Sequence, residues 1–107
     1  MSPLVLVCES PLIDRYLAML VRRLGREAIC ARARDAVEMV QAGGRRVDLL
    51  ITNSPREFEE VAGNVPFLYV SSTPDPEVAA RFPRLLVLLK PFRPADLMEA
   101  VEALTAS

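Results

Sequence analysis

The sequence predicts an α/β domain built on a five-stranded parallel sheet with helices on both faces. Five short apolar runs alternate along the chain with segments of helical spacing, and this alternation is typical of right-handed β-α-β crossovers. The central run, Val47–Thr52, is almost wholly apolar and lies between turn residues. A short run of this kind is typical of a strand that is buried on both faces.

The composition fits one domain spanning residues 1–107. The chain is 51% hydrophobic and carries a formal net charge of −1, so it can build a core and is not expected to be disordered. A charge near zero provides no field to attract nucleic acid or an anionic membrane. No apolar run approaches the length of a membrane span, so neither kind of partner is expected.

Histidine is absent from the chain, and there are two cysteines, Cys8 and Cys30. The absence of histidine excludes Ser-His and Cys-His catalytic pairs and the common zinc sets. Two free thiols predict a reducing cytoplasm, and the Ala- and Arg-rich composition is typical of a GC-rich bacterial genome.

Four further runs are rich in β-forming residues and lie between turn residues. In chain order, these predicted strands are Leu4–Val7, Ala28–Ala31, Phe67–Val70 and Leu85–Leu89. Doubly wound sheets of this size commonly take the flavodoxin-like order 2-1-3-4-5. In that order the Val47–Thr52 strand is central and the last strand lies at an edge.

Helix-start and helix-stop signals lie between the strands. Ser10 is a good N-cap and Pro11 suits the first helical position, so the first helix is predicted to begin there and to end at Gly25. Asp35 can cap a second helix, which Gly43 closes.

The third helix is predicted at Arg56–Ala62, the fourth at Glu77–Phe82, and the last from Pro94 onwards. Ser71 follows Asn53 by only 18 positions, and that gap must hold a loop, a helix and part of a strand. Because a helix advances about 1.5 Å per residue, the third helix is predicted to be short or irregular.

Parallel strands bring their carboxyl ends to one edge of a sheet, where the ligands of such folds bind. The side chains predicted to meet there are Cys8, Glu9, Asn53, Ser71 and Lys90. At the exit of the central strand, the chain has a carboxamide where many enzymes would need a carboxylate.

This constellation resembles the receiver domain of two-component response regulators, over essentially the whole chain. Val7–Pro11 lies where that family carries an acidic pair, and Asp48–Asn53 resembles the strand leading to its phosphoryl-accepting aspartate. Ser71 falls on the Ser/Thr switch position. Lys90–Phe92 reproduces the Lys-Pro-Phe tripeptide of the family's last strand.

The resemblance implies that the family's phosphotransfer chemistry is lost here. In the family, an aspartate forms an acyl phosphate and, with the acidic pair, holds Mg²⁺. Asn53 occupies the acceptor position, Cys8 replaces one acid, and only Glu9 remains. Because Mg²⁺ prefers charged oxygen ligands, its binding is expected to be weak or absent, and no cofactor is expected. Lys90 is then predicted to pair with Glu9 or to bond to Asn53.

We therefore interpret the chain as a pseudo-receiver that signals through protein contacts and not as an enzyme. The last strand is wholly apolar, and an exposed apolar edge is prone to aggregate unless it is covered or used. A protein partner or a second copy is predicted to bind the face formed by the fourth helix, fifth strand and fifth helix. The residues predicted for this interface are Arg81, Arg84, Val87, Arg93 and Glu99.

Other interpretations stay open for the same residues. Asn53 could cap a turn, Lys90 could be solvated, and Ser71 could form a turn. Cys8 is either a reactive thiol near a helix N-terminus or a small buried residue. The alternative functions are a phosphoacceptor with an unusual site that uses Glu9 or Ser71, and a Cys8-based phosphotransfer enzyme. That enzyme would need an anion-cradling loop, and the segment after Cys8 has no glycine.

Three further groups near these motifs are interpreted as structural. Asp48 begins its strand, at the end away from the predicted pocket, and so cannot replace the acceptor. Asp14 is interpreted as a surface charge on the first helix, and Cys30 is expected in the core.

Overall fold

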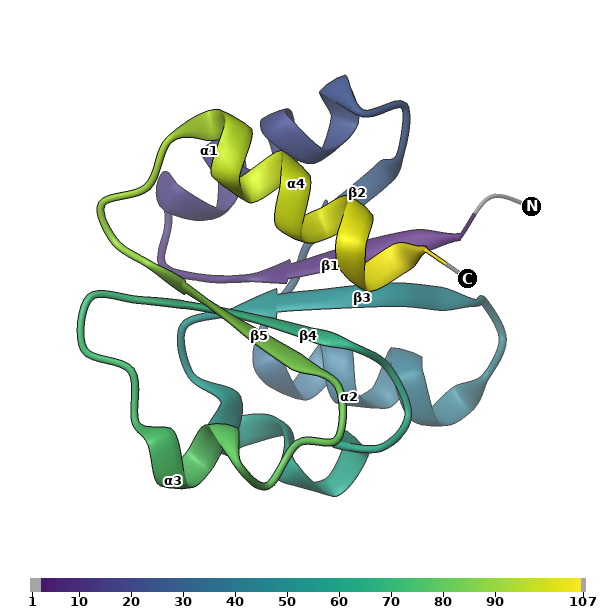
Figure 1. The fold of residues 1–107 in the computed structure, drawn as a ribbon. Coiled ribbons are helices and arrows are strands. Elements are labelled where there is room, and N and C mark those ends of the chain that lie inside the picture. The colour runs from purple at the N-terminus through teal and green to yellow at the C-terminus, as the bar shows by residue number, and fades with distance from the viewer. Residues whose placement is uncertain (1–2, 107) are drawn as a thin grey trace.

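Five parallel strands form one sheet in the order β2-β1-β3-β4-β5 (Figure 1). The computed structural model describes residues 3–106. The strands are β1 (Leu4–Cys8), β2 (Glu27–Cys30), β3 (Val47–Thr52), β4 (Phe67–Ser71) and β5 (Leu85–Leu89). The predicted α/β class and flavodoxin-like strand order are therefore confirmed, with β3 central and β5 at an edge.

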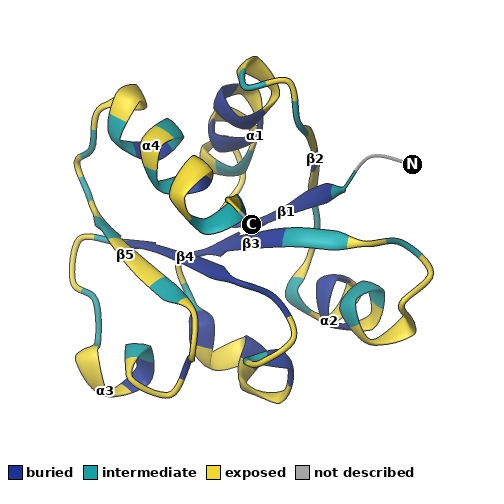
Figure 2. Ribbon diagram, turned by 45° about the vertical axis from the view of Figure 1, so that its right-hand side comes forward, coloured by how far each residue is buried: buried dark blue, intermediate teal, exposed yellow. Residues whose placement is uncertain are grey.

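Helices connect the strands and cover both faces of the sheet (Figure 2). They are α1 (Ile13–Arg23), α2 (Ala33–Ala42), the 3-10 helix η1 (Pro55–Val61), α3 (Pro76–Ala79) and α4 (Pro94–Thr105). α1 and α4 pack on one face, while α2, η1 and α3 pack on the other. No helix within residues 3–106 is both long enough and apolar enough to cross a membrane.

Alternation along β1 divides its apolar side chains between two cores. Val5 and Val7 join the buried cluster beneath α1 and α4, whereas Leu4 and Leu6 join the cluster beneath α2 and η1. All five residues of this strand are buried. A strand covered on both faces needs apolar side chains on both, which explains why the runs seen in the sequence lack polar alternation.

The first helix begins later than predicted. Ser10 does not cap it, because Leu12 occupies the N-cap position and no side chain caps the helix. The Ser10 N–H donates to Glu9 Oε1 at 3.0 Å, and its hydroxyl donates to the same oxygen at 3.5 Å. A turn follows, in which Leu12 adopts a left-handed backbone with φ of 78°. Ser10 thus lies in the turn before the helix, in contact with the carboxylate of Glu9.

The predicted cap of the second helix was also wrong. Arg32 occupies the N-cap position with an extended backbone, and Asp35 lies in the first turn of α2. A carboxylate in the first turn is stabilised by the positive end of the helix dipole without acting as a cap. Gly43 closes the helix as predicted, with φ of 66°.

The short connection between β3 and β4 produces the predicted irregular third helix. η1 is a 3-10 helix, interrupted at Phe58, where φ is −121° and ψ is 15°. The fourth helix, α3, has a single turn and is shorter than the predicted Glu77–Phe82. The Asp75 side chain caps it by accepting the Glu77 N–H at 2.9 Å.

Phe67→Ala is expected to lower the free energy of unfolding by about 3–5 kcal/mol. The Phe67 ring is fully buried, and its centroid lies 5.9 Å from that of Phe58 and 4.8 Å from that of Phe82. Truncation therefore opens a cavity between aromatic rings from three segments. Urea denaturation followed by circular dichroism measures the loss.

Leu89→Ala is the matched control, because the Leu89 side chain is exposed on β5. It is expected to change the free energy of unfolding by no more than about 0.5 kcal/mol. Equal losses for the two variants would contradict the assignment of Phe67 to the core.

Candidate functional site

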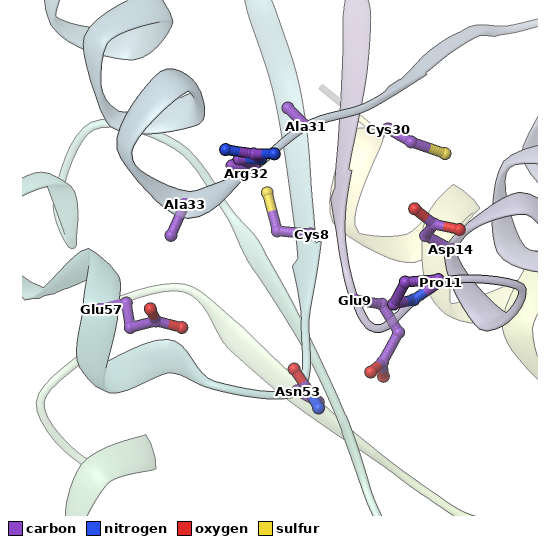
Figure 3. A pocket seen from close by; sticks show the side chains of 10 residues that line it. All are labelled: Cys8, Glu9, Pro11, Asp14, Cys30, Ala31, Arg32, Ala33, Asn53 and Glu57. Atoms are coloured by element: carbon purple, nitrogen blue, oxygen red, sulfur yellow. The ribbon is translucent and has the colours of Figure 1, made fainter.

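A cavity of about 510 Å³ opens at the carboxyl ends of β1 and β3 (Figure 3). Its lining residues are Cys8, Glu9, Pro11, Asp14, Cys30, Ala31, Arg32, Ala33, Asn53 and Glu57. Three of the five predicted pocket residues, Cys8, Glu9 and Asn53, therefore share one cavity. Ser71 and Lys90 do not line it.

Lys90 is joined to the cavity through an ion pair with Glu9. Its Nζ lies 3.0 Å from Glu9 Oε2, and the Glu9 side chain is only 1% exposed, against 27% for Lys90. The other carboxylate oxygen accepts the Ser10 N–H. Of the two predicted partners for Lys90, the structure selects Glu9, and both oxygens of this carboxylate are engaged.

Asn53 has a different environment from Glu9. The residue is exposed, and its carboxamide forms no hydrogen bond with any group in residues 3–106. The turn that follows β3 is held instead by Thr52, whose Oγ1 accepts the Ser54 N–H at 2.9 Å. Asn53 is thus not needed to cap that turn, and it presents a neutral, unpaired amide to the cavity.

The Cys8 thiol is held in its neutral form. Burial raises its pKa to about 12, with smaller contributions from the charge of Glu57 and from Cys30. A thiol with so high a pKa is almost wholly protonated at neutral pH and is a poor nucleophile. Between the two interpretations of Cys8, the structure supports the small buried residue.

Cys30 is half-buried beside the core under α1, close to its predicted location. Burial raises the pKa of this thiol, and the charge of Asp14 raises it further. Neither cysteine is therefore activated, although both line the cavity.

The Ser71 hydroxyl forms a turn. Its Oγ accepts the Thr73 N–H at 3.0 Å, and its carbonyl accepts the Lys90 N–H at 3.0 Å. These contacts agree with the interpretation of Ser71 as a turn-forming residue. No hydrogen bond within residues 3–106 directs its hydroxyl into the cavity.

Two charged residues that the sequence analysis did not single out, Arg32 and Glu57, also line the cavity, together with Asp14. The interpretation of Asp14 as a plain surface charge was wrong, because Asp14 Oδ1 is buried and forms no hydrogen bond among residues 3–106. Their positions in the sequence could have indicated that they line the cavity, because each of these residues lies within a few residues of the carboxyl end of a strand.

The donors at the sheet mouth do not fit a magnesium site. Glu9 is committed to Lys90, Asn53 offers an uncharged oxygen, and Cys8 offers a neutral sulfur. Figure 3 shows the Glu57 and Asp14 carboxylates on opposite sides of Cys8. Within residues 3–106, no three acidic or thiol groups converge closely enough to hold a metal ion.

The residues predicted for the partner face divide into two groups. Arg81 forms an ion pair with Glu59 at 3.0 Å, and Arg93 forms one with Asp96 at 3.4 Å. The other three residues are exposed: Arg84, Val87 and Glu99. The two charged ones form no ion pair within residues 3–106.

Comparison with solved structures identifies the fold. The response regulator receiver protein of Sinorhizobium medicae has a TM-score of 0.78 and 22% identity, covering 99% of this chain and 95% of its own. The chemotaxis response regulator CheY4 of Vibrio cholerae has a TM-score of 0.74 and 22% identity, with coverages of 97% and 98%.

A third similar structure is the receiver domain of a sensor histidine kinase from Pseudomonas aeruginosa, with a magnesium ion coordinated in its active-site cleft. Its TM-score is 0.78 at 19% identity, with coverages of 99% and 98%. No protein-family profile and no curated protein sequence matches this chain. The chain has the receiver fold of response regulators, as its resemblance to that family predicted.

Lys90→Met is expected to lower the free energy of unfolding by about 2 kcal/mol, because it leaves the buried Glu9 carboxylate without its charge partner. Glu9→Gln is expected to cost less, since the partly exposed Lys90 can regain water. Urea denaturation of the two variants and of the double variant measures the coupling. Arg93→Ala, which removes an exposed ion pair, is the control and is expected to cost under about 0.5 kcal/mol.

Alkaline pH is expected to destabilise the protein through Cys8. Its thiol has an ordinary pKa of 9.0 and a folded-state pKa of about 12, so between these values the folded chain keeps a proton that the unfolded chain loses. Below pH 9 this contribution is fully present, and above it the free energy of unfolding falls by up to about 1.4 kcal/mol per pH unit. The free energies of unfolding of wild type and of Cys8→Ala can be measured by urea denaturation at pH 8 and pH 10. The difference between them should be smaller at pH 10, whereas a constant difference would contradict the burial of this thiol.

Proposed function

We propose that residues 1–107 form a single receiver-like signalling domain that acts through protein contacts, without aspartyl phosphorylation, in a two-component-type system. The receiver fold supports the signalling class, and the chemistry of the sheet mouth supports the loss of phosphotransfer. In this proposal the domain is not an enzyme, and its two free thiols suit a reducing cytoplasm.

The observation that carries the proposal is the state of Glu9, Lys90 and Asn53. An acyl phosphate needs a carboxylate nucleophile, and a carboxamide is neutral and poorly nucleophilic. Glu9 provides the carboxylate next to the acceptor position, and Lys90 binds it at 3.0 Å. Neither group is then free to hold a cation or to stabilise a phosphoryl group.

The Pseudomonas neighbour shows that a receiver fold of this shape is compatible with magnesium. The backbone is therefore not the obstacle in this chain. The difference lies in the side chains, because Mg²⁺ requires several hard oxygen donors in near-octahedral geometry. The paired Glu9 and the amide of Asn53 do not provide them.

The two alternative functions have less support. Glu9 as an unusual acceptor would have to leave its ion pair with Lys90, and the Ser71 hydroxyl already accepts the Thr73 N–H. A Cys8 phosphotransfer enzyme would need a thiolate, and the pKa of Cys8 is raised to about 12. Protein contact through the face formed by α3, β5 and α4 is better supported, since three leucine or valine side chains of β5 are exposed there.

Wild-type protein incubated with acetyl phosphate and Mg²⁺ is expected to gain no phosphoryl group, as measured by intact mass under conditions that preserve acyl phosphates. The reason is the absence of a free carboxylate at position 53. A stable phosphoryl adduct on the wild-type chain would overturn the proposal.

Asn53→Asp is the matched variant for that experiment, because it restores a carboxylate at the acceptor position and alters no other residue. Phosphoryl uptake by this variant alone would assign the loss of chemistry to position 53. If neither protein gained a phosphoryl group, the loss of chemistry would be assigned to the Glu9–Lys90 ion pair as well as to position 53.

A further inference from the structure

The cavity at the carboxyl ends of β1 and β3 contains a buried carboxylate oxygen that the protein leaves unsatisfied. Asp14 Oδ1 is buried and forms no hydrogen bond within residues 3–106, although Asp14 lies beside the Cys30 thiol. A thiol is a weak donor, and a buried acceptor without a partner is rare in native proteins because it costs free energy. A donor on a bound ligand would stabilise this oxygen.

Three further polar side chains on the wall of this cavity are accessible. Arg32, Asn53 and Glu57 are exposed, and their side chains form no hydrogen bond or ion pair in the part of the chain that the structure describes. Figure 3 shows the carboxylates of Glu57 and Asp14 on opposite sides of Cys8. The two carboxylates therefore provide two separate positions for positive charge.

Arg32 and the N-terminal end of α2 provide a position for negative charge. Arg32 is the N-cap residue of this helix of 10 residues, and no side chain caps the helix. Ala33, its first residue, also lines the cavity, whereas Asp35 in the first turn does not. A ligand carboxylate beside Arg32 would interact with the guanidinium and with the positive end of the helix dipole.

Apolar surface separates these charged positions. In Figure 3, Cys8, Ala31 and Ala33 lie between Glu57 and Asp14. Small apolar side chains and a neutral thiol suit contact with a short aliphatic chain. The cavity volume of about 510 Å³ lies within the range of roughly 300–1,000 Å³ that is typical of small-molecule sites.

We propose that this cavity binds a basic amino acid, a ligand with two cationic groups and one carboxylate. Asp14 and Glu57 hold the two cationic groups, and Arg32 binds the carboxylate. These three side chains carry formal charges that sum to −1, whereas a basic amino acid carries +1 at neutral pH. Lys90 already neutralises Glu9, so this carboxylate does not alter the balance.

Other classes of ligand match fewer of these groups. A phosphate ester or a dicarboxylate would be repelled by Asp14 and Glu57, and a divalent cation would be repelled by Arg32. A neutral apolar molecule would leave Asp14 Oδ1 without a donor. Asn53 suits the proposed ligand, because a carboxamide can donate to its carboxylate or accept from its ammonium.

The inference deepens the proposed function and rests on it, because it takes the Glu9–Lys90 ion pair as intact. In this account, a small molecule provides the signal that a phosphoryl group provides in a phosphorylated receiver. Ligand binding at the sheet mouth then regulates the protein contacts of the domain.

Isothermal titration calorimetry of the wild-type chain with L-arginine, without Mg²⁺ or phosphoryl donor, tests the inference. Saturable binding is expected. Agmatine lacks the carboxylate and L-citrulline lacks the charge of the side chain, so each is expected to bind about tenfold or more weakly. Equal affinity for the three compounds would overturn the inference, as would no saturable binding of either L-arginine or L-lysine up to about 10 mM.

Isosteric variants assign the charged groups. Asp14→Asn and Glu57→Gln are each expected to lower the affinity for L-arginine by about tenfold or more. Arg32→Gln is expected to lower the affinity for L-arginine but not that for agmatine, which has no carboxylate to lose. Glu99→Gln, on α4 and outside this cavity, is the control and is expected to leave binding unchanged.

Wild-type affinity in the Asp14, Glu57 and Arg32 variants would overturn the inference. Circular dichroism checks that each variant is folded. Because Glu57 is exposed, Glu57→Gln carries the test if Asp14→Asn does not fold. Phosphoryl uptake by the wild-type chain would overturn the proposed function, whereas a failure to bind basic amino acids would overturn only this inference, so the two failures are distinguishable.

Discussion

The ion pair between Glu9 and Lys90 determines the chemistry of the sheet mouth. It joins the segments that follow β1 and β5, at opposite ends of the chain, and it buries the carboxylate almost completely. A buried carboxylate without a partner is strongly destabilising. The ammonium is therefore directed towards Glu9, and this pairing leaves neither Lys90 nor Glu9 free to bind a ligand in the cavity. The neutral Asn53 amide and the protonated, buried Cys8 thiol also line this cavity.

The lengths of two connections decide what surrounds this site. The segment between β3 and β4 accommodates only the irregular η1, and α3 provides one helical turn before Phe82 enters the core. A connection this short cannot cover the outer strand. The exposed apolar edge of β5 and the cavity at the carboxyl ends of the strands thus belong to the same sheet but have independent causes. Short connections leave the β5 edge exposed, whereas the identity of the side chains determines the chemistry of the cavity.

Much of the site could be predicted because parallel strands share one carboxyl edge. Residues that directly follow β1 and β5, such as Glu9 and Lys90, meet there whatever the details of the intervening helices. The exact start of each helix was less predictable, because the sequence offered Ser10 as an N-cap, whereas in the structure Leu12 occupies that position and Ser10 bonds to the neighbouring Glu9. The role of Asp14 was misjudged for the same reason, since its direction depends on where α1 begins.

The sequence by itself determined the fold class, the strand order, the edge position of β5 and the place of Asn53 at the exit of the central strand. These follow from apolar periodicity, from turn residues and from residue identity, all of which are local properties of the chain. Only the tertiary structure decided that Lys90 binds Glu9, that Arg81 pairs with Glu59, and that Val87 remains exposed. Such outcomes depend on distances and directions that arise only when the sheet and its helices pack together.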